Sequence, residues 1–286
     1  MFPKANNIKG FIRYLSFMQA VKLILFFSML IAAIWAIILS VKKRKVTGAP
    51  VTDDRTLSEH VSFYRRLDHS ERERFRQEAD DFLQQVAITA VNTVVTDTDK
   101  ILIAAGAVIP MFAFKGWRYP NLKEVLVYND SFNMNFETQG EESRNILGLV
   151  GTGVYRDKMM ISKNALQHGF SNDTDLSNTA IHEFVHLIDG ADGATDGLPE
   201  ILLDKAYILP WMELIHREME KMKEPDSDIN PYGYTNRSEF FAVVSEYFFE
   251  KPELFEQNHP ELFRMMEKAF RTKKSDPPGD APLNTY

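Results

Sequence analysis

The chain has 286 residues, of which 44% are hydrophobic and 12% aromatic, which is typical of a globular protein with a packed core. It has no cysteine, which excludes disulfide bonds, thiolate metal ligands and cysteine nucleophiles. Residues 1–46 carry eight Lys or Arg and no Asp or Glu, so the remainder has 25 basic against 40 acidic residues, a net charge of −15. Because phosphate binding needs clustered Lys and Arg, this acidic remainder argues against a nucleic acid partner.

The basic N-terminal segment 1–22 leads into 19 uncharged residues at 23–41, rich in Leu, Ile, Phe and Ala. A helix of this length rises about 28 Å, close to the roughly 30 Å hydrocarbon core of a bilayer. The stretch is too long for a cleaved signal peptide, and four basic residues follow it at 42–45. The pattern predicts one transmembrane helix. The four basic residues favour a cytoplasmic location for the rest of the chain, while the basic residues of 1–22 favour the opposite orientation.

Residues 42–59 are polar with Gly and Pro, and predict a linker. The spacing of apolar residues from 60 to 272 predicts a single α+β domain, dominated by helices and containing a small sheet. Two strands are expected, and the second is a candidate for a sheet edge that pairs with an extended peptide. The tail 273–286 is rich in Pro and Asp and is expected to be disordered. The expected strands lie at 124–128 and 157–162, and the expected helices lie within 60–85, 101–114, 175–188, 209–223, 238–250 and 260–272.

The chemistry of the chain is indicated by an HExxH motif, which runs from His182 to His186. On a helix, residues four apart lie on one face, so both imidazoles can reach one zinc ion. Glu183 can then act as the general base that takes a proton from the attacking water and later delivers it to a leaving amine. Uncharged residues surround the pair, which is expected for a buried metal-binding helix rather than for a surface helix.

A third protein ligand is needed if one coordination position is to stay open for water. Asp192 lies six residues after His186, beyond a glycine-containing turn. Glu239 and Glu246 lie 53 and 60 residues after His186, in an aromatic helix where unpartnered carboxylates would be costly. These two are seven residues apart on one helix face, so one can be a ligand and the other can contact a ligand. Spacing alone does not rank the three. Asp189 is a candidate acceptor for the free N–H group of a ligand histidine.

Two sequence blocks carry a resemblance to a known family: HEFVHLIDGADG at 182–193 and SEFFAVVSEYFFEKPELF at 238–255. They resemble the Mlc titration factor A family of glucose-regulated zinc metallopeptidases, and more distantly the catalytic domain of anthrax lethal factor. The resemblance implies a zincin-like (gluzincin) fold with one catalytic Zn²⁺ held by His182, His186 and Glu239. It also implies that Glu183 is the catalytic base, and that Tyr232 stabilises the oxyanion, a role for which a phenol donor is suited. Tyr234 is the neighbouring alternative.

The resemblance also implies the activity and the partners. We expect a membrane-anchored zinc-dependent peptidase, either an aminopeptidase or an endopeptidase, that acts on a peptide or protein substrate. The alternative is a regulatory protein that sequesters a transcriptional repressor, with proteolysis secondary. Members of the family are cytosolic and soluble, and the predicted span at 23–41 departs from that pattern. The expected location is therefore the bacterial inner membrane, with the catalytic domain in the cytoplasm.

Overall fold

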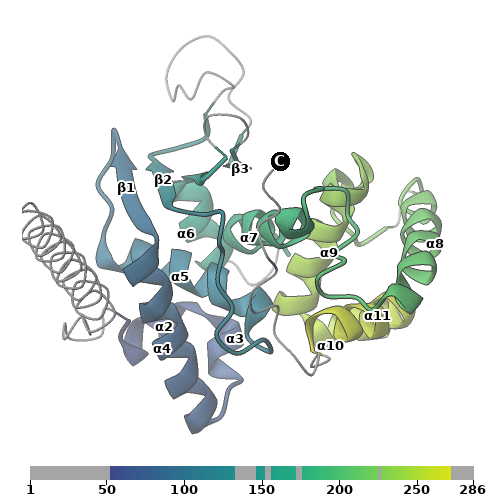
Figure 1. Ribbon diagram of the computed structural model, residues 1–286, viewed down its shortest axis with the longest axis horizontal. Helices are drawn as coiled ribbons and strands as arrows, with labels where there is room; N and C mark the ends of the chain where they lie inside the picture. The colour runs from purple at the N-terminus through teal and green to yellow at the C-terminus, as the bar shows by residue number, and fades with distance from the viewer. Residues whose placement is uncertain (1–51, 133–145, 152–155, 172–175, 225–226, 272–286) are drawn as a thin grey trace, which may run out of the picture. The chain divides into compact units, whose positions relative to one another are not determined.

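The computed structural model describes residues 52–132, 146–151, 156–171, 176–224 and 227–271 (Figure 1). The predicted transmembrane helix at 23–41 and the predicted tail at 273–286 lie outside these residues. Among the helices that are described, none is long and apolar enough to cross a membrane.

A four-stranded sheet forms one side of the folded part, in the order β1-β2-β4-β3. The first three strands in this order are parallel, while β3 runs antiparallel to β4. Parallel neighbours need a crossover connection, and the helix between β1 and β2 supplies one. Successive residues face opposite sides of a strand, so one face of the sheet carries the buried side chains of Val125, Val127, Met159 and Ile161. The strands are β1 (Ala87–Val91), β2 (Glu124–Tyr128), β3 (Gly148–Val150) and β4 (Lys158–Ser162).

The crossover helix between β1 and β2 is the most hydrophobic helix of this half of the domain. It begins at a capping box, in which Thr96 accepts from the backbone N–H of Asp99 and Asp99 accepts from that of Thr96. All its residues from Ile101 to Met111 are buried, as predicted. The helices of this half are α2 (Asp54–His60), α3 (Ser62–Arg65), α4 (His69–Gln85), the crossover helix α5 (Asp97–Met111) and α6 (Lys163–Ser171).

The regular elements of the C-terminal half are all helices within the described residues. Its central helix packs directly on α5, because Gly106 has no side chain: a Cβ at that position would lie 2.6 Å from the Cβ of Ala180. In Figure 1 this helix, α7, runs between the sheet with its helices and the C-terminal helices. The elements are α7 (Thr179–Asp189), η2 (Gly190–Asp192), α8 (Lys205–Lys221), η3 (Pro231–Tyr234), α9 (Arg237–Glu250), α10 (Pro252–Asn258) and α11 (Pro260–Phe270).

The α+β class, the dominance of helices and the two predicted strands are confirmed. The linker prediction for 42–59 is wrong in its last part, because α2 lies within it and Leu57 is fully buried in the core. One apolar residue in a polar segment gives too weak a signal for a helix. The strand at 158–162 is not an edge strand, because β3 pairs with its outer side. Helices α6 and α10 and strands β1 and β3 are short and were not predicted.

Candidate metal centre

The HExxH motif lies on α7, where helix geometry places its two histidines on one face. The helix begins at Asn178, whose side-chain oxygen accepts from the backbone N–H of Ile181. Its buried stripe of apolar residues packs on the core, and it includes Phe184 and Val185 inside the motif. His182 and His186 are partly buried and lie on the remaining face, which is directed at α9. The local sequence therefore fixes the direction of both imidazoles.

The third group comes from the first turn of α9. Asn236 caps this helix by accepting from the backbone N–H of Glu239 at 3.0 Å, and an acidic residue is favoured in the first turn by the helix dipole. The cap therefore fixes where Glu239 leaves the helix. The side chains of this helix from Phe240 to Phe249 are buried, which fixes its rotation against α7.

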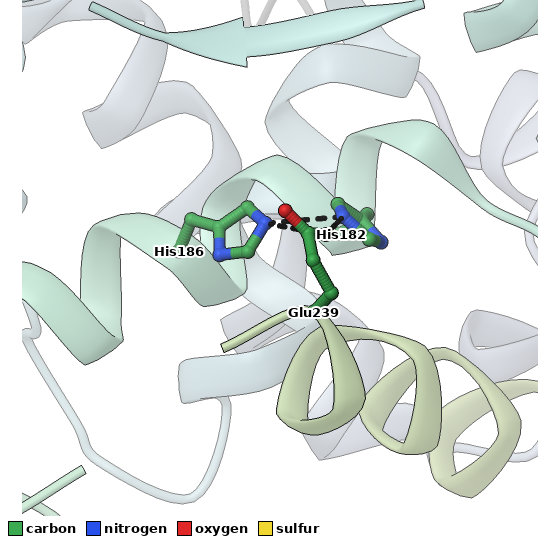
Figure 2. A group of neighbouring side chains, drawn as sticks. All are labelled: His182, His186 and Glu239. Atoms are coloured by element: carbon green, nitrogen blue, oxygen red, sulfur yellow. Dashed lines mark hydrogen bonds and ion pairs between the residues drawn. The ribbon is translucent and has the colours of Figure 1, made fainter. Parts of the chain in front are cut away.

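Three donor atoms converge between the two helices (Figure 2). The Nε2 atoms of His182 and His186 are 3.1 Å apart, and Oε2 of Glu239 is 2.9 Å from the first and 3.3 Å from the second. Ligands at about 2.0–2.1 Å from a tetrahedral zinc ion are roughly 3.3 Å from one another. Two imidazole nitrogens and one carboxylate oxygen at these separations fit one zinc ion and leave a coordination position open.

The other two candidates for the third ligand do not reach this point. Asp192 is exposed, and its carboxylate accepts from the backbone N–H groups of Ala194 and Glu200. Glu246 is buried, but it contacts the far side of His182: its Oε1 accepts from Nδ1 of that residue at 2.7 Å. The two glutamates of α9 are seven residues apart. This spacing puts the carboxylate of Glu239 beside the Nε2 atoms and that of Glu246 at Nδ1 of His182.

Each histidine has its Nδ1 atom held by a partner, which directs Nε2 to the candidate metal position. Behind His182 the partner is Glu246, which also accepts from the backbone N–H of Asn178. Behind His186 the partner is Ser238, whose Oγ lies 3.1 Å from Nδ1 and donates to Asp189 at 3.2 Å. The expectation that Asp189 would contact a ligand histidine directly is therefore corrected: Ser238 lies between them.

The charges of the site are strongly coupled. Burial disfavours the charged imidazolium of His182, but the carboxylates of Glu246 and Glu239 outweigh this effect and raise its pKa to about 10. Burial likewise disfavours the charged form of Glu239, but hydrogen bonds from the two histidines lower its pKa to about 2. Without a metal, the raised pKa of His182 means that its imidazole holds a proton. This positive charge lies where the two imidazoles and the carboxylate of Glu239 could hold a metal cation. Burial raises the pKa of Glu183.

Glu183 and Tyr232 both lie near His182. Glu183 is only 4% exposed, and its Oε2 atom is buried without a hydrogen-bond partner. The ring of Tyr232 lies 6.0 Å from that of His182, measured between centroids, and its side chain is exposed. Tyr234 instead has its ring 5.9 Å from Nζ of Lys223. Only one of these two tyrosines therefore faces the candidate metal position.

Several residues of the site were not identified from the sequence, among them Asn178, Asn236 and Ser238. The two asparagines could have been predicted as N-caps, because each lies three or four residues before a site residue at the start of an expected helix. Ser238 had none, since its contact with His186 joins residues 52 positions apart.

We expect Glu246→Ala to lower the affinity for Zn²⁺ by about 10- to 100-fold, because the imidazole of His182 would lose the acceptor that orients it. Equilibrium dialysis of the purified chain against buffered Zn²⁺ measures this. Glu250→Ala is the matched control, because this carboxylate lies one turn further along α9 and accepts from the side chain of Asn178 rather than from a histidine. Equal zinc affinity in wild type and Glu246→Ala would contradict the role assigned to Glu246.

Comparison with known proteins agrees with the geometry of this site. The model of the glucose-regulated metallo-peptidase M90 family matches residues 39–271. Mlc titration factor A of Pectobacterium atrosepticum is 29% identical over 222 residues, which cover 72% of this chain and 80% of the relative. Mlc titration factor A of Escherichia fergusonii is 30% identical over 205 residues, which cover 65% and 73%. An uncharacterized protein of Synechocystis sp. is 28% identical over 224 residues, which cover 75% and 81%.

The resemblance to the Mlc titration factor A family, expected from the two sequence blocks, is thereby confirmed. The matched region contains all the described elements and every residue of the candidate metal centre. The chain belongs to the glucose-regulated metallo-peptidase M90 family.

Proposed function

We propose that this chain is a zinc-dependent peptidase whose metal ligands are His182, His186 and Glu239. The observation that carries the proposal is the convergence of two Nε2 atoms and one carboxylate oxygen within 3.3 Å of one another, beside a buried glutamate. A purely structural zinc site has no use for an adjacent carboxylate that is left without a partner. A bound zinc ion would supply Lewis-acid activation of water and of the substrate carbonyl.

Glu183 is proposed as the general base. Its unpartnered Oε2 atom is available to accept a proton from the attacking water and to return that proton to the leaving amine. The burial that raises its pKa also makes it a stronger proton acceptor than an exposed carboxylate. Proton transfer of this kind contributes about 10²- to 10⁴-fold to the rate.

Tyr232 is proposed as the donor that stabilises the developing oxyanion. Burial, together with the charges of Glu239 and Glu183, raises the pKa of its phenol, so the hydroxyl group keeps its proton at neutral pH. Its position beside His182, on the short helix η3 that precedes α9, places this donor at the exposed side of the site. The substrate can therefore approach from that side.

The substrate is proposed to be an extended peptide that pairs with β3. The residues that flank this strand, Leu147 and Gly151, form backbone hydrogen bonds with Ser162 and Lys158 of β4. Because antiparallel strands alternate, the backbone groups of Gly148 and Val150 face the outer side, where the described residues supply no further strand. A peptide added there would lie along α7 and bring its carbonyl groups past the site. Either an aminopeptidase or an endopeptidase can use this arrangement.

A membrane anchor is part of the proposal and depends on the sequence alone. The 19 uncharged residues at 23–41 and the basic residues after them support one span, with the catalytic domain on the cytoplasmic side of a bacterial inner membrane. This location would confine hydrolysis to substrates at the membrane surface.

We expect the full chain, purified in detergent, to bind one equivalent of zinc and to hydrolyse peptides. Glu183→Gln should keep the metal and lose at least about 100-fold in kcat, because the amide cannot accept the proton. Glu239→Ala should lose both, because only two ligands remain. Elemental analysis and hydrolysis of a fluorogenic peptide library measure the two quantities.

Asp192→Ala is the matched control, since this carboxylate was a candidate ligand and lies away from the site. Full activity of Glu183→Gln would exclude the mechanism, and full zinc content of Glu239→Ala would exclude that ligand. Release of the chain from membranes by alkaline carbonate would exclude the anchor.

Tyr232→Phe should lower kcat by about 10²-fold with zinc content unchanged, because one oxyanion donor is removed. Tyr234→Phe removes the same atom two residues away and should leave kcat within about twofold, since that ring lies beside Lys223. Steady-state kinetics on one peptide decides between them. The reverse order of effects would assign the donor role to Tyr234.

The second candidate function is capture of a transcriptional repressor, with proteolysis secondary. Two of the relatives are named titration factors of Mlc, and this name supports a binding role for a related chain. The Glu183→Gln variant separates the two functions in cells: restoration of a deletion phenotype by this variant supports capture, and failure to restore it supports proteolysis. Immunoblotting for equal amounts of wild type and variant is the control.

A further inference from the structure

One glycine of the edge strand lies directly against the general base. Gly148 and Glu183 touch so closely that a Cβ built on the glycine would lie 2.5 Å from Oε1, 2.6 Å from Cγ and 2.8 Å from Cδ of the glutamate. Gly148 pairs with Ile161, which is fully buried, so its missing side chain would point to the helix-covered face of the sheet.

The glycine is not required by the backbone. Three glycines among the described residues have a positive φ, at 116, 193 and 197, and Gly148 is not one of them. An alanine could therefore adopt the backbone conformation of this position, and the three nearest atoms that its Cβ would meet all belong to the side chain of Glu183, which would have to shift.

The described residues give the Glu183 side chain no hydrogen bond that would hold it. Oε2 is buried without a partner, and the residue is almost fully enclosed. Its position is therefore set by packing, and Gly148 is one of the residues against which it packs. A base without a hydrogen-bonded support depends on the shape of its surroundings for its distance from the reacting proton.

We propose that Gly148 is a positioning residue for catalysis: the absence of a side chain on β3 determines where the carboxylate of Glu183 lies. This inference rests on the proposed peptidase function. The same residue presents its backbone N–H and C=O to the outer edge of the sheet, as derived from the hydrogen bonds on either side of it. The strand proposed to bind the substrate and the position of the base are thus coupled through one residue.

The expected effect of a methyl group follows from the distances. Ordinary contact between these atoms begins at 3.4 Å, and the Cβ of Gly148→Ala would start 2.5 Å from Oε1. Relief of the overlap requires a displacement of roughly 1 Å, and a misplacement of that size costs on the order of 10²-fold in rate.

The first measurement is kinetic. Gly148→Ala in the full-length chain should lower kcat by about 10- to 100-fold on a fluorogenic peptide, change KM less than about threefold, and retain one equivalent of zinc. An increase in KM with kcat unchanged would overturn the proposal, since it would mean that the methyl group acts on the substrate edge. Loss of zinc would overturn it as well.

The second measurement needs no activity. In a double-mutant cycle on the thermal midpoint, Gly148→Ala should lower Tm by roughly 2–6 °C in the wild-type chain, and should leave Tm unchanged or raised in the Glu183→Ala background, where the methyl group has room. Gly106→Ala is the matched control, because its Cβ would meet Ala180, which lies on α7, the helix that also carries Glu183. This variant should lower Tm equally in both backgrounds.

Equal changes in Tm for Gly148→Ala in both backgrounds would overturn the proposed contact. If the wild-type chain hydrolyses no peptide, the proposed function fails, and the cycle still decides whether Gly148 and Glu183 compete for one space.

Discussion

The packing of α7 on α9 is the constraint on which the site depends. Each helix brings part of the candidate metal-binding set: α7 carries two imidazoles, and α9 carries one carboxylate beside them and one behind them. The rotation of α9 is fixed by buried side chains along almost its whole length. A rotation of α9 would turn both carboxylates away from His182, because residues seven apart lie on one face of a helix.

This arrangement places several charged groups where water is scarce, and each needs a partner. The carboxylate of Glu246 is satisfied by the imidazole of His182 and the backbone of Asn178. Asp189 is held by Ser238 and by the backbone N–H of Gly197. Two carboxylate oxygens of the site are exceptions: Oε2 of Glu183 and the second oxygen of Asp189, Oδ1, have no partner among the described residues. A buried carboxylate oxygen without a hydrogen bond costs folding free energy, and such a cost is commonly found at groups that act on a substrate.

The core holds the two helices of the site through a close helix contact at one glycine and through packed aromatic rings. Gly106 allows α5 to touch α7, and Phe184 inside the motif packs its ring 5.1 Å from that of Tyr119 and 5.5 Å from that of Phe82. The helix that carries the motif, α7, is therefore packed against the core on the side opposite its histidines. On α9, Phe241 stacks on Phe270 of α11 with an interplanar angle of 3°. These contacts keep the two helices in a fixed relation, which a preorganised metal centre needs.

The sequence by itself determined what depends on neighbouring residues. The four-residue spacing of His182 and His186 fixes their common face, because one helical turn is a local property. The strands at β2 and β4 and the buried helix α5 followed from short-range patterns in the same way. The predicted membrane span is also a local pattern, and it lies outside the described residues.

Residue spacing did not decide which distant carboxylate meets the histidines; the family resemblance implied Glu239, and the packing of the helices in the tertiary structure is what brings it there. Asp192, Glu239 and Glu246 were equivalent by spacing, because the sequence does not show the angle at which α9 crosses α7. The structure places Glu239 at the Nε2 atoms and Glu246 at Nδ1. The edge strand β3 and the contact of Gly148 with Glu183 also join segments that are far apart in the chain. Such contacts are set by packing of whole elements, which leaves no periodic signal in the residues themselves.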